Sequence, residues 1–131
     1  MLTELTIKDF ISKVISNDPV PGGGSVSALN GALAAALSAM VANLTVGRKK
    51  YVEVNDLMQE LSTRFEKLSQ KLIEDVDRDS DAYNRVFAAF KLPKETDEEK
   101  QFRSEAIQQE TKYAAQVPME VARAVYEVLP Q

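Results

Sequence analysis

Apolar residues recur at helical spacing over most of the chain and predict four to five helices. A first, short helix is predicted to begin at Thr6, because Asp9 follows three residues later in the pattern of a capping box. Its apolar face holds Ile7, Phe10, Ile11 and Val14. Prolines at positions 19 and 21 then end any helical pattern.

A second helix is predicted to start at Ser25 or Ser27, either of which can cap it, and to end near Val46, with Gly47 just beyond. Small residues three or four apart dominate it: Ala28, Gly31, Ala32, Ala35, Ser38, Ala39 and Ala42. A surface this smooth lets another helix approach closely.

No charged residue occurs between Pro19 and Gly47, so this stretch is also long enough to span a bilayer. Against a span stand Asn30, Asn43 and the excess of alanine over larger apolar residues, which makes insertion weakly driven. A helix buried in a bundle or a dimer is the favoured interpretation, with no membrane contact.

A third helix is predicted over residues 52–92, where Pro93 stops it. Its apolar residues fall on a single seam: Leu61, Phe65, Leu68, Leu72, Val76, Tyr83, Val86 and Phe90. A fourth helix is predicted from Thr96, with Glu99 completing a capping box, and Pro118 is expected to kink or interrupt it before Val121, Val125 and Leu129. The expected fold is a single all-α domain over residues 1–131.

The amino-acid composition excludes several kinds of catalytic and binding site. The chain has 131 residues, 44% of them hydrophobic, and a net charge of -4, which offers no overall field to attract nucleic acid. It has no cysteine and no histidine, so thiol nucleophiles, disulfides, zinc fingers and imidazole acid/base catalysis are excluded. The first residues lack the apolar core of a secretory signal, which favours a cytoplasmic protein.

Asp79 is the most informative residue. It falls in the middle of the apolar seam, whereas Asp77 and Asp81 fall on the opposite, solvated face. A carboxylate that faces a core must be paired, hydrogen-bonded or shifted toward its neutral form. Asp79 is therefore either a structural acid bonded to a helix cap or a lysine, or a general acid/base or an anion that holds a cationic substrate.

The segment PGGGS, residues 21–25, has two interpretations. It lacks the lysine and the spacing of a P-loop, so a nucleotide phosphate site is not expected. Its glycines permit close backbone approach, and the helix start after them offers free amides to an anion or a polar ring edge. The alternative is a plain flexible turn.

Two basic clusters flank the long helix. Arg48, Lys49 and Lys50 follow the second helix, where cations favour its dipole, and Lys91 and Lys94 bracket Pro93. Besides the structural role, both clusters can contact an acidic ligand.

Three segments resemble the cyclodeaminase domain of the formiminotransferase-cyclodeaminase family: PVPGGGSVSALNGALAAALSAMVANLTVGRKKY, DSDAYNRVFAAFKLPK and AAQVPMEVA. The resemblance covers nearly the whole chain, and by this comparison we expect this sequence to stop before the family's C-terminal segment. It implies a helical homodimer that handles folate-bound one-carbon units, as a formiminotetrahydrofolate cyclodeaminase (an ammonia lyase) or a methenyltetrahydrofolate cyclohydrolase. It also implies a tetrahydrofolate derivative as substrate, with no metal and no tightly bound cofactor.

The resemblance also implies site residues. Asp79 would be the catalytic acid. The substrate would be bound by Gly22, Gly23, Gly24, Ser25, Tyr83 and Lys94, and its acidic tail by Lys49 and Lys50. The alternative is a non-catalytic helical module that binds folate or dimerises through the second helix.

Overall fold

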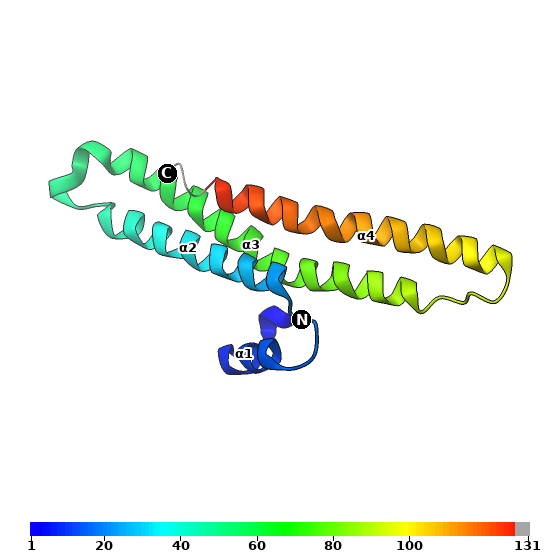
Figure 1. The fold of residues 1–131 in the computed structure, drawn as a ribbon. Helices are drawn as coiled ribbons and strands as arrows, with labels where there is room; N and C mark the ends of the chain where they lie inside the picture. Colours follow the sequence, from blue (N-terminus) through cyan, green and yellow to red (C-terminus); the bar gives the residue numbers. More distant parts are fainter. Residues whose placement is uncertain (128–131) are drawn as a thin grey trace.

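The computed structural model describes residues 1–127 and contains only helices over that range. Three long helices lie side by side, and a short one projects from their flank (Figure 1). This confirms the predicted all-α class. The α-helices are α1 (Ile7–Ile15), α2 (Gly23–Thr45), α3 (Asn55–Phe90) and α4 (Asp97–Tyr126), and 3-10 helices occupy Leu2–Glu4 and Lys49–Val54.

α3 is the central element. α2 pairs with its first half and α4 with its second half, both running antiparallel to it (Figure 1). The main core cluster forms where the three helices meet, around the fully buried Leu72 and Val76. A second cluster lies further along the α2–α3 pair.

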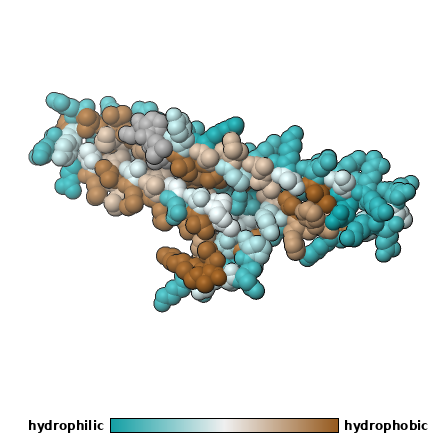
Figure 2. All heavy atoms as spheres, in the orientation of Figure 1, coloured by the Kyte–Doolittle hydropathy of each residue, from teal (hydrophilic) through white to brown (hydrophobic). Residues whose placement is uncertain are grey.

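The start predicted for α1 is confirmed, because the Thr6 side chain accepts a hydrogen bond from the Asp9 backbone N–H. Only Phe10 on this helix is buried in the core. The other residues of its apolar face are exposed, and they line a groove of about 510 Å³ against α2 and α3. α1 appears in Figure 2 as a strongly hydrophobic projection.

α2 begins at Gly23, earlier than predicted, and its N-cap Gly22 makes no side-chain capping bond. The prediction that Ser25 or Ser27 caps this helix is therefore wrong. Its end is confirmed at Thr45, and Gly47 follows with a φ of 79°. Six residues of the predicted small-residue stripe are buried as expected: Ala28, Gly31, Ala32, Ala35, Ala39 and Ala42. Ser38, also predicted on this stripe, is only half-buried.

The stripe packs within the chain. An added Cβ at Gly31 would lie 2.8 Å from Val125 Cγ2 and 3.1 Å from Leu72 Cδ1. Ala35 is fully buried in a cluster with Phe65. A second copy of the chain would therefore have to use the other face of α2, where Leu33 and Leu37 are exposed.

α2 is long and apolar enough to cross a membrane, with a mean hydropathy of 1.6 in its most apolar window. The core helix of a soluble protein passes the same test, and α2 lies against α3 along its length (Figure 1). This packing buries 39% of that window, and the absence of membrane contact stays a prediction.

α3 is shorter than predicted at both ends, because residues 49–54 form a 3-10 helix and the α-helix stops at Phe90. Its apolar seam is buried at Phe65, Leu72 and Val76. Further on, Tyr83 and Phe90 are exposed. The seam passes from buried to exposed at the point where α2 begins. The contact between Ser25, in the first turn of α2, and the carbonyl of Val76 marks that point on α3.

The capping box predicted for α4 is confirmed: the Thr96 side chain accepts from the Glu99 N–H, and the Glu99 side chain accepts from the Thr96 N–H. An interruption at Pro118 is wrong, because the helix is continuous to Tyr126, and the alternative of a kink there stays a prediction. A proline removes one hydrogen bond from the ladder, but the buried neighbours Val117 and Val121 hold the helix against the core. Leu129, predicted on this helix, lies outside the described residues.

Candidate active site

The glycine turn and Asp79 lie against each other. An ideal Cβ built on Gly24 would lie within 2.5 Å of all three atoms of the Asp79 carboxyl group. A glycine is therefore required at position 24 for this close approach. The structure brings together two features that the sequence singled out separately.

Ser25 connects the first turn of α2 to α3. Its hydroxyl lies 2.7 Å from the carbonyl oxygen of Val76, 2.7 Å from Ser80 Oγ and 3.3 Å from Asp79 Oδ2. Ser25 is 0% exposed and Ser80 is 4% exposed, so water does not compete for these contacts. Ser25 therefore turns its hydroxyl toward α3, and its predicted role in lining the substrate site stays a prediction.

Burial raises the pKa of Asp79 above its ordinary range. Hydrogen bonds from the Ser25 hydroxyl and backbone N–H oppose this shift, and the negative charge of Asp75 adds to it. The Ser25 N–H belongs to the first turn of α2, so Asp79 supplies the N-terminus of that helix with the carboxylate that Gly22 lacks. A raised pKa makes this carboxyl group a better proton acceptor than an ordinary aspartate, which suits a general base.

A groove of about 570 Å³ opens beside the glycine turn. One wall is the first turn of α2, with Gly23, Gly24 and Ser27, and the other is the last part of α4, from Pro118 to Tyr126. Tyr83 lies one helical turn after Asp79 on α3 and is 43% exposed. Gly24 both lines this groove and packs on Asp79, whereas neither Asp79 nor Tyr83 is among the residues that line it.

The predicted lysines lie elsewhere. Lys49 and Lys50 follow the far end of α2, which at 23 residues is about 35 Å long. Lys94 lies beyond the other end of α3, and Phe90, the last residue of that helix, lies 11 positions after Asp79, about 16 Å along the axis. One chain does not bring these lysines to Asp79, and their contact with a ligand stays a prediction.

Asp75 is a buried acid that the sequence reasoning missed. Its side chain lies 3.3 Å from Arg78 Nη1 and 3.9 Å from Lys71 Nζ, and the residue is only 2% exposed. Arg78 also pairs with Glu120 on α4 at 2.5 Å, which links α3 to α4. The spacing of Lys71, Asp75 and Arg78, four and then three residues, is the sequence signal that could have revealed this network.

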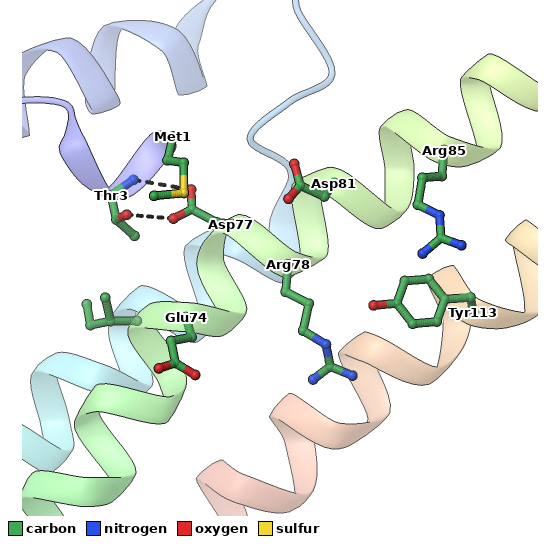
Figure 3. Close-up of a pocket in the computed structure, with 9 residues that line it drawn as sticks. Met1, Thr3, Glu74, Asp77, Arg78, Asp81, Arg85 and Tyr113 are labelled. Atoms are coloured by element: carbon green, nitrogen blue, oxygen red, sulfur yellow. Dashed lines mark hydrogen bonds between the residues drawn. The ribbon is translucent and has the colours of Figure 1, made fainter.

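Asp77 was expected to be solvated like Asp81, and this is wrong. Its carboxylate accepts a hydrogen bond from the Leu2 N–H at 2.6 Å. It also accepts one from the Thr3 hydroxyl at 2.5 Å, drawn in Figure 3, and so it holds the N-terminal 3-10 helix against α3. Asp81 is exposed, as predicted. The sequence spacing gave no sign that a distant segment would cover Asp77.

A second pocket, of about 530 Å³ and lined largely by charged side chains, lies beside Asp77. Arg78 and Arg85 reach from α3 to either side of Tyr113 on α4 (Figure 3). Arg85 lies over the Tyr113 ring at 4.6 Å and pairs with Glu110 at 2.8 Å. Both arginines are thus engaged in joining α3 to α4. Within residues 1–127, no group of three or more acidic side chains has the arrangement of a metal site.

Comparisons with known proteins agree with the predicted resemblance. The family model described as formiminotransferase-cyclodeaminase matches residues 6–131. The methenyltetrahydrofolate cyclohydrolase of Methylorubrum extorquens is 42% identical over 124 residues, which are 95% of this chain and 60% of that protein. The formimidoyltransferase-cyclodeaminase of Rattus norvegicus is 36% identical over 98% of this chain and 24% of that protein.

Among solved structures, the formiminotetrahydrofolate cyclodeaminase of Thermotoga maritima superposes with a TM-score of 0.78 and 34% identity. The match covers 95% of this chain and 58% of that one. The chain thus spans about three fifths of these two bacterial proteins and a smaller share of the rat protein.

Proposed function

Since the chain belongs to the formiminotransferase-cyclodeaminase family, we propose that it acts on a folate-bound one-carbon unit, as a formiminotetrahydrofolate cyclodeaminase or a methenyltetrahydrofolate cyclohydrolase. The observation that carries this proposal is the Asp79 carboxyl group, which is packed on Gly24, bonded to Ser25 and raised in pKa by burial. An acid/base of this kind suits both reactions.

In the cyclodeaminase reaction, N10 of the folate attacks the formimino carbon carried on N5. The tetrahedral adduct has a proton to lose from N10 and an amino group that must gain one before it leaves as ammonia. Asp79 takes the first proton and delivers the second, and the N5–CH–N10 methenyl bridge remains. The negative form of Asp79 also stabilises the amidinium-like cation on this path.

In the cyclohydrolase reaction, water attacks the carbon of the methenyl bridge, and one C–N bond then breaks to leave a formyl group. Asp79 removes a proton from the attacking water and delivers it to the departing nitrogen, and the remaining hydroxyl proton of the adduct is released to solvent as the formyl C=O forms. Both reactions use the same cationic carbon and the same folate frame. The relatives include both activities, so the chemistry of Asp79 supports the two equally.

The substrate takes its place along the glycine turn in this proposal. Gly22, Gly23 and Gly24 offer backbone close to the reacting carbon, and Tyr83 provides a ring face near it. The groove beside Gly24 supports this assignment, because its α4 wall is mostly apolar.

Lys94, Lys49 and Lys50 are proposed to contact the acidic tail of the substrate. Because they lie at opposite ends of the chain's long axis, one site cannot use all three from a single copy. A homodimer fits this distribution, and the exposed apolar faces of α1 and α2 offer surface for it. A single domain, cytoplasmic location and operation without a tightly bound cofactor complete the proposal.

The experiment is to incubate the purified chain with 5-formiminotetrahydrofolate and, separately, with 5,10-methenyltetrahydrofolate, and to follow the methenyl absorbance. A cyclodeaminase makes the absorbance rise with the first substrate, and a cyclohydrolase makes it fall faster than the buffer blank with the second. Asp79→Asn is expected to lower the rate by about 100-fold or more. The exposed Asp81→Asn, on the same helix, is the matched control and should keep the wild-type rate.

The second candidate is a folate-binding module without activity. The observation that favours it is the position of the predicted lysines, which one chain does not bring to Asp79. It predicts that a tetrahydrofolate derivative quenches the fluorescence of the chain's tyrosines with no turnover. Equal rates for the wild type, Asp79→Asn and the blank would decide for it.

A further inference from the structure

Ser80 is a buried hydroxyl that the proposed reaction does not use. It lies on α3 directly after Asp79, is 4% exposed, and its Oγ is 2.7 Å from Ser25 Oγ. Ser25 in turn reaches the Asp79 carboxylate and the Val76 carbonyl. The three side chains form one connected set between the two helices.

The number of hydroxyl protons determines which group donates to which in this set. Each serine has one proton to donate, while the carbonyl of Val76 and the carboxylate oxygen of Asp79 only accept. If Ser25 donated its proton to Ser80, neither the Val76 carbonyl nor Asp79 Oδ2 would receive a hydrogen bond from the Ser25 hydroxyl. When Ser80 donates to Ser25 instead, the proton of Ser25 is free for either the Val76 carbonyl at 2.7 Å or Asp79 Oδ2 at 3.3 Å.

We propose that Ser80 is a positioning residue for Asp79: by donating to Ser25, it leaves the Ser25 proton to move between the Val76 carbonyl and the Asp79 carboxylate. The proton of Ser25 points to Val76 when Asp79 is neutral and to Asp79 when it is ionised. Donation from Ser80 also polarises the Ser25 hydroxyl and makes it a stronger donor. The pair thereby favours the ionised form of Asp79 against the burial that opposes it.

The other charged groups near Asp79 do not duplicate this effect. α2 has no charged residue, so its side contributes only the Ser25 groups and the helix N-terminus. On α3, Asp75 disfavours the charge on Asp79, and it is itself paired with Arg78, which reaches Glu120 on α4. Two phenols also lie near this site: that of Tyr83, one turn after Asp79 on α3, and that of Tyr126, across the groove from Gly24.

This inference deepens the proposed function and rests on it for its catalytic meaning, but the titration of Asp79 can be measured without a substrate. The test is ¹³C NMR of the chain labelled at the aspartate carboxyl carbons, with the Asp79 signal identified by its loss in Asp79→Asn. We expect the midpoint of that signal to shift upward in Ser80→Ala, and to shift further in Ser25→Ala. Ser80→Thr, which keeps the hydroxyl, should restore the wild-type midpoint.

Ser69→Ala is the matched control. Ser69 lies on α3, and its hydroxyl donates to the Ala32 carbonyl of α2 at 3.0 Å, so its loss removes a similar bond between the same helices. It lies ten residues before Asp79, about 15 Å along the helix, and should leave the midpoint unchanged. If Ser80→Ala shifts the midpoint no more than Ser69→Ala does, or if Ser80→Thr shifts it as much as Ser80→Ala, the proposal is wrong.

Two further measurements keep the outcome clear. Circular dichroism establishes that each variant is folded, and Ser80→Cys, with a weaker donor, replaces Ser80→Ala if the latter unfolds; its midpoint should also rise. The pH profile of turnover then separates the two proposals. If the NMR midpoint moves in Ser80→Ala and the profile does not, the role of Ser80 stands and the catalytic role of Asp79 is lost.

Discussion

Gly24→Ala places a methyl group where the Asp79 carboxyl group lies. The added Cβ would come within 2.5 Å of the carboxyl carbon and both oxygens, while ordinary contacts begin at 3.4 Å, so the carboxyl group must move by about 1 Å. The movement takes it away from Ser25, whose hydroxyl is already at 3.3 Å. The variant therefore loses both the position and the hydrogen bond of Asp79.

The free energy of unfolding follows from three contributions. Alanine in place of glycine stabilises a helix by about 1 kcal/mol. Loss of the Ser25 hydrogen bond costs about 1 kcal/mol and crowding costs about 1–3 kcal/mol. We expect Gly24→Ala to be less stable than the wild type by about 1–3 kcal/mol, and a displacement of 1 Å to lower kcat/KM by about 100-fold.

Gly23→Ala is the control for stability, because an added Cβ there meets nothing within 4 Å. It should be as stable as the wild type or slightly more so in urea unfolding followed by circular dichroism. The turnover assay with the folate substrates measures the loss at Gly24. Equal stability of the two variants, with wild-type kcat/KM in Gly24→Ala, would refute the close approach of Gly24 to Asp79.

Three other changes test the fold and the electrostatics. The raised pKa of Asp79 means that the folded state holds its proton more tightly than the unfolded state, so this group destabilises the fold as the pH rises from about 4 through the raised value. Asp79→Asn should remove this loss of stability. In urea titrations at several pH values, the free energy of unfolding of Asp79→Asn relative to the wild type should therefore increase with pH over this window. A difference that does not change with pH would contradict the raised pKa of Asp79. Leu72→Ala, at a fully buried position, should lower the free energy of unfolding by about 2–5 kcal/mol in the same titration, and a loss below 1 kcal/mol would show that the core is not centred there. Gly31→Ala should lower it by up to about 2 kcal/mol despite the better helix former, because its Cβ would press on Val125 and Leu72; a gain in stability would show that α2 and α4 are further apart.

Much of the fold was predictable because its signals are local. Thr6 and Asp9, and Thr96 and Glu99, announce two helix starts through contacts three residues apart, and both are confirmed. Gly47 takes the positive φ that ends a helix. Periodicity likewise placed Leu72 and Val76 in the core, because a single helix determines which of its residues share a face.

The start of α2 was not predictable in this way. Its first turn has no side-chain cap of its own, and the carboxylate beside it comes from Asp79, 54 residues after Ser25. A capping pattern read from neighbouring residues cannot contain a partner so far along the chain. The prediction therefore moved the helix start to the nearest serine.

The sequence by itself determined the all-α class, the main helix faces and the choice of Asp79, since these depend on residue type and on a repeat of three or four positions. Only the tertiary structure decided that Gly24 lies on Asp79, that Asp75 and Asp77 are engaged, and that Tyr83 is exposed. Burial at a given position depends on where a neighbouring helix begins and ends. The N-terminus of α2 contacts Val76 and Asp79 and so separates the buried part of the α3 seam from its exposed part. The same contact holds the Asp79 carboxylate at the end of a helix.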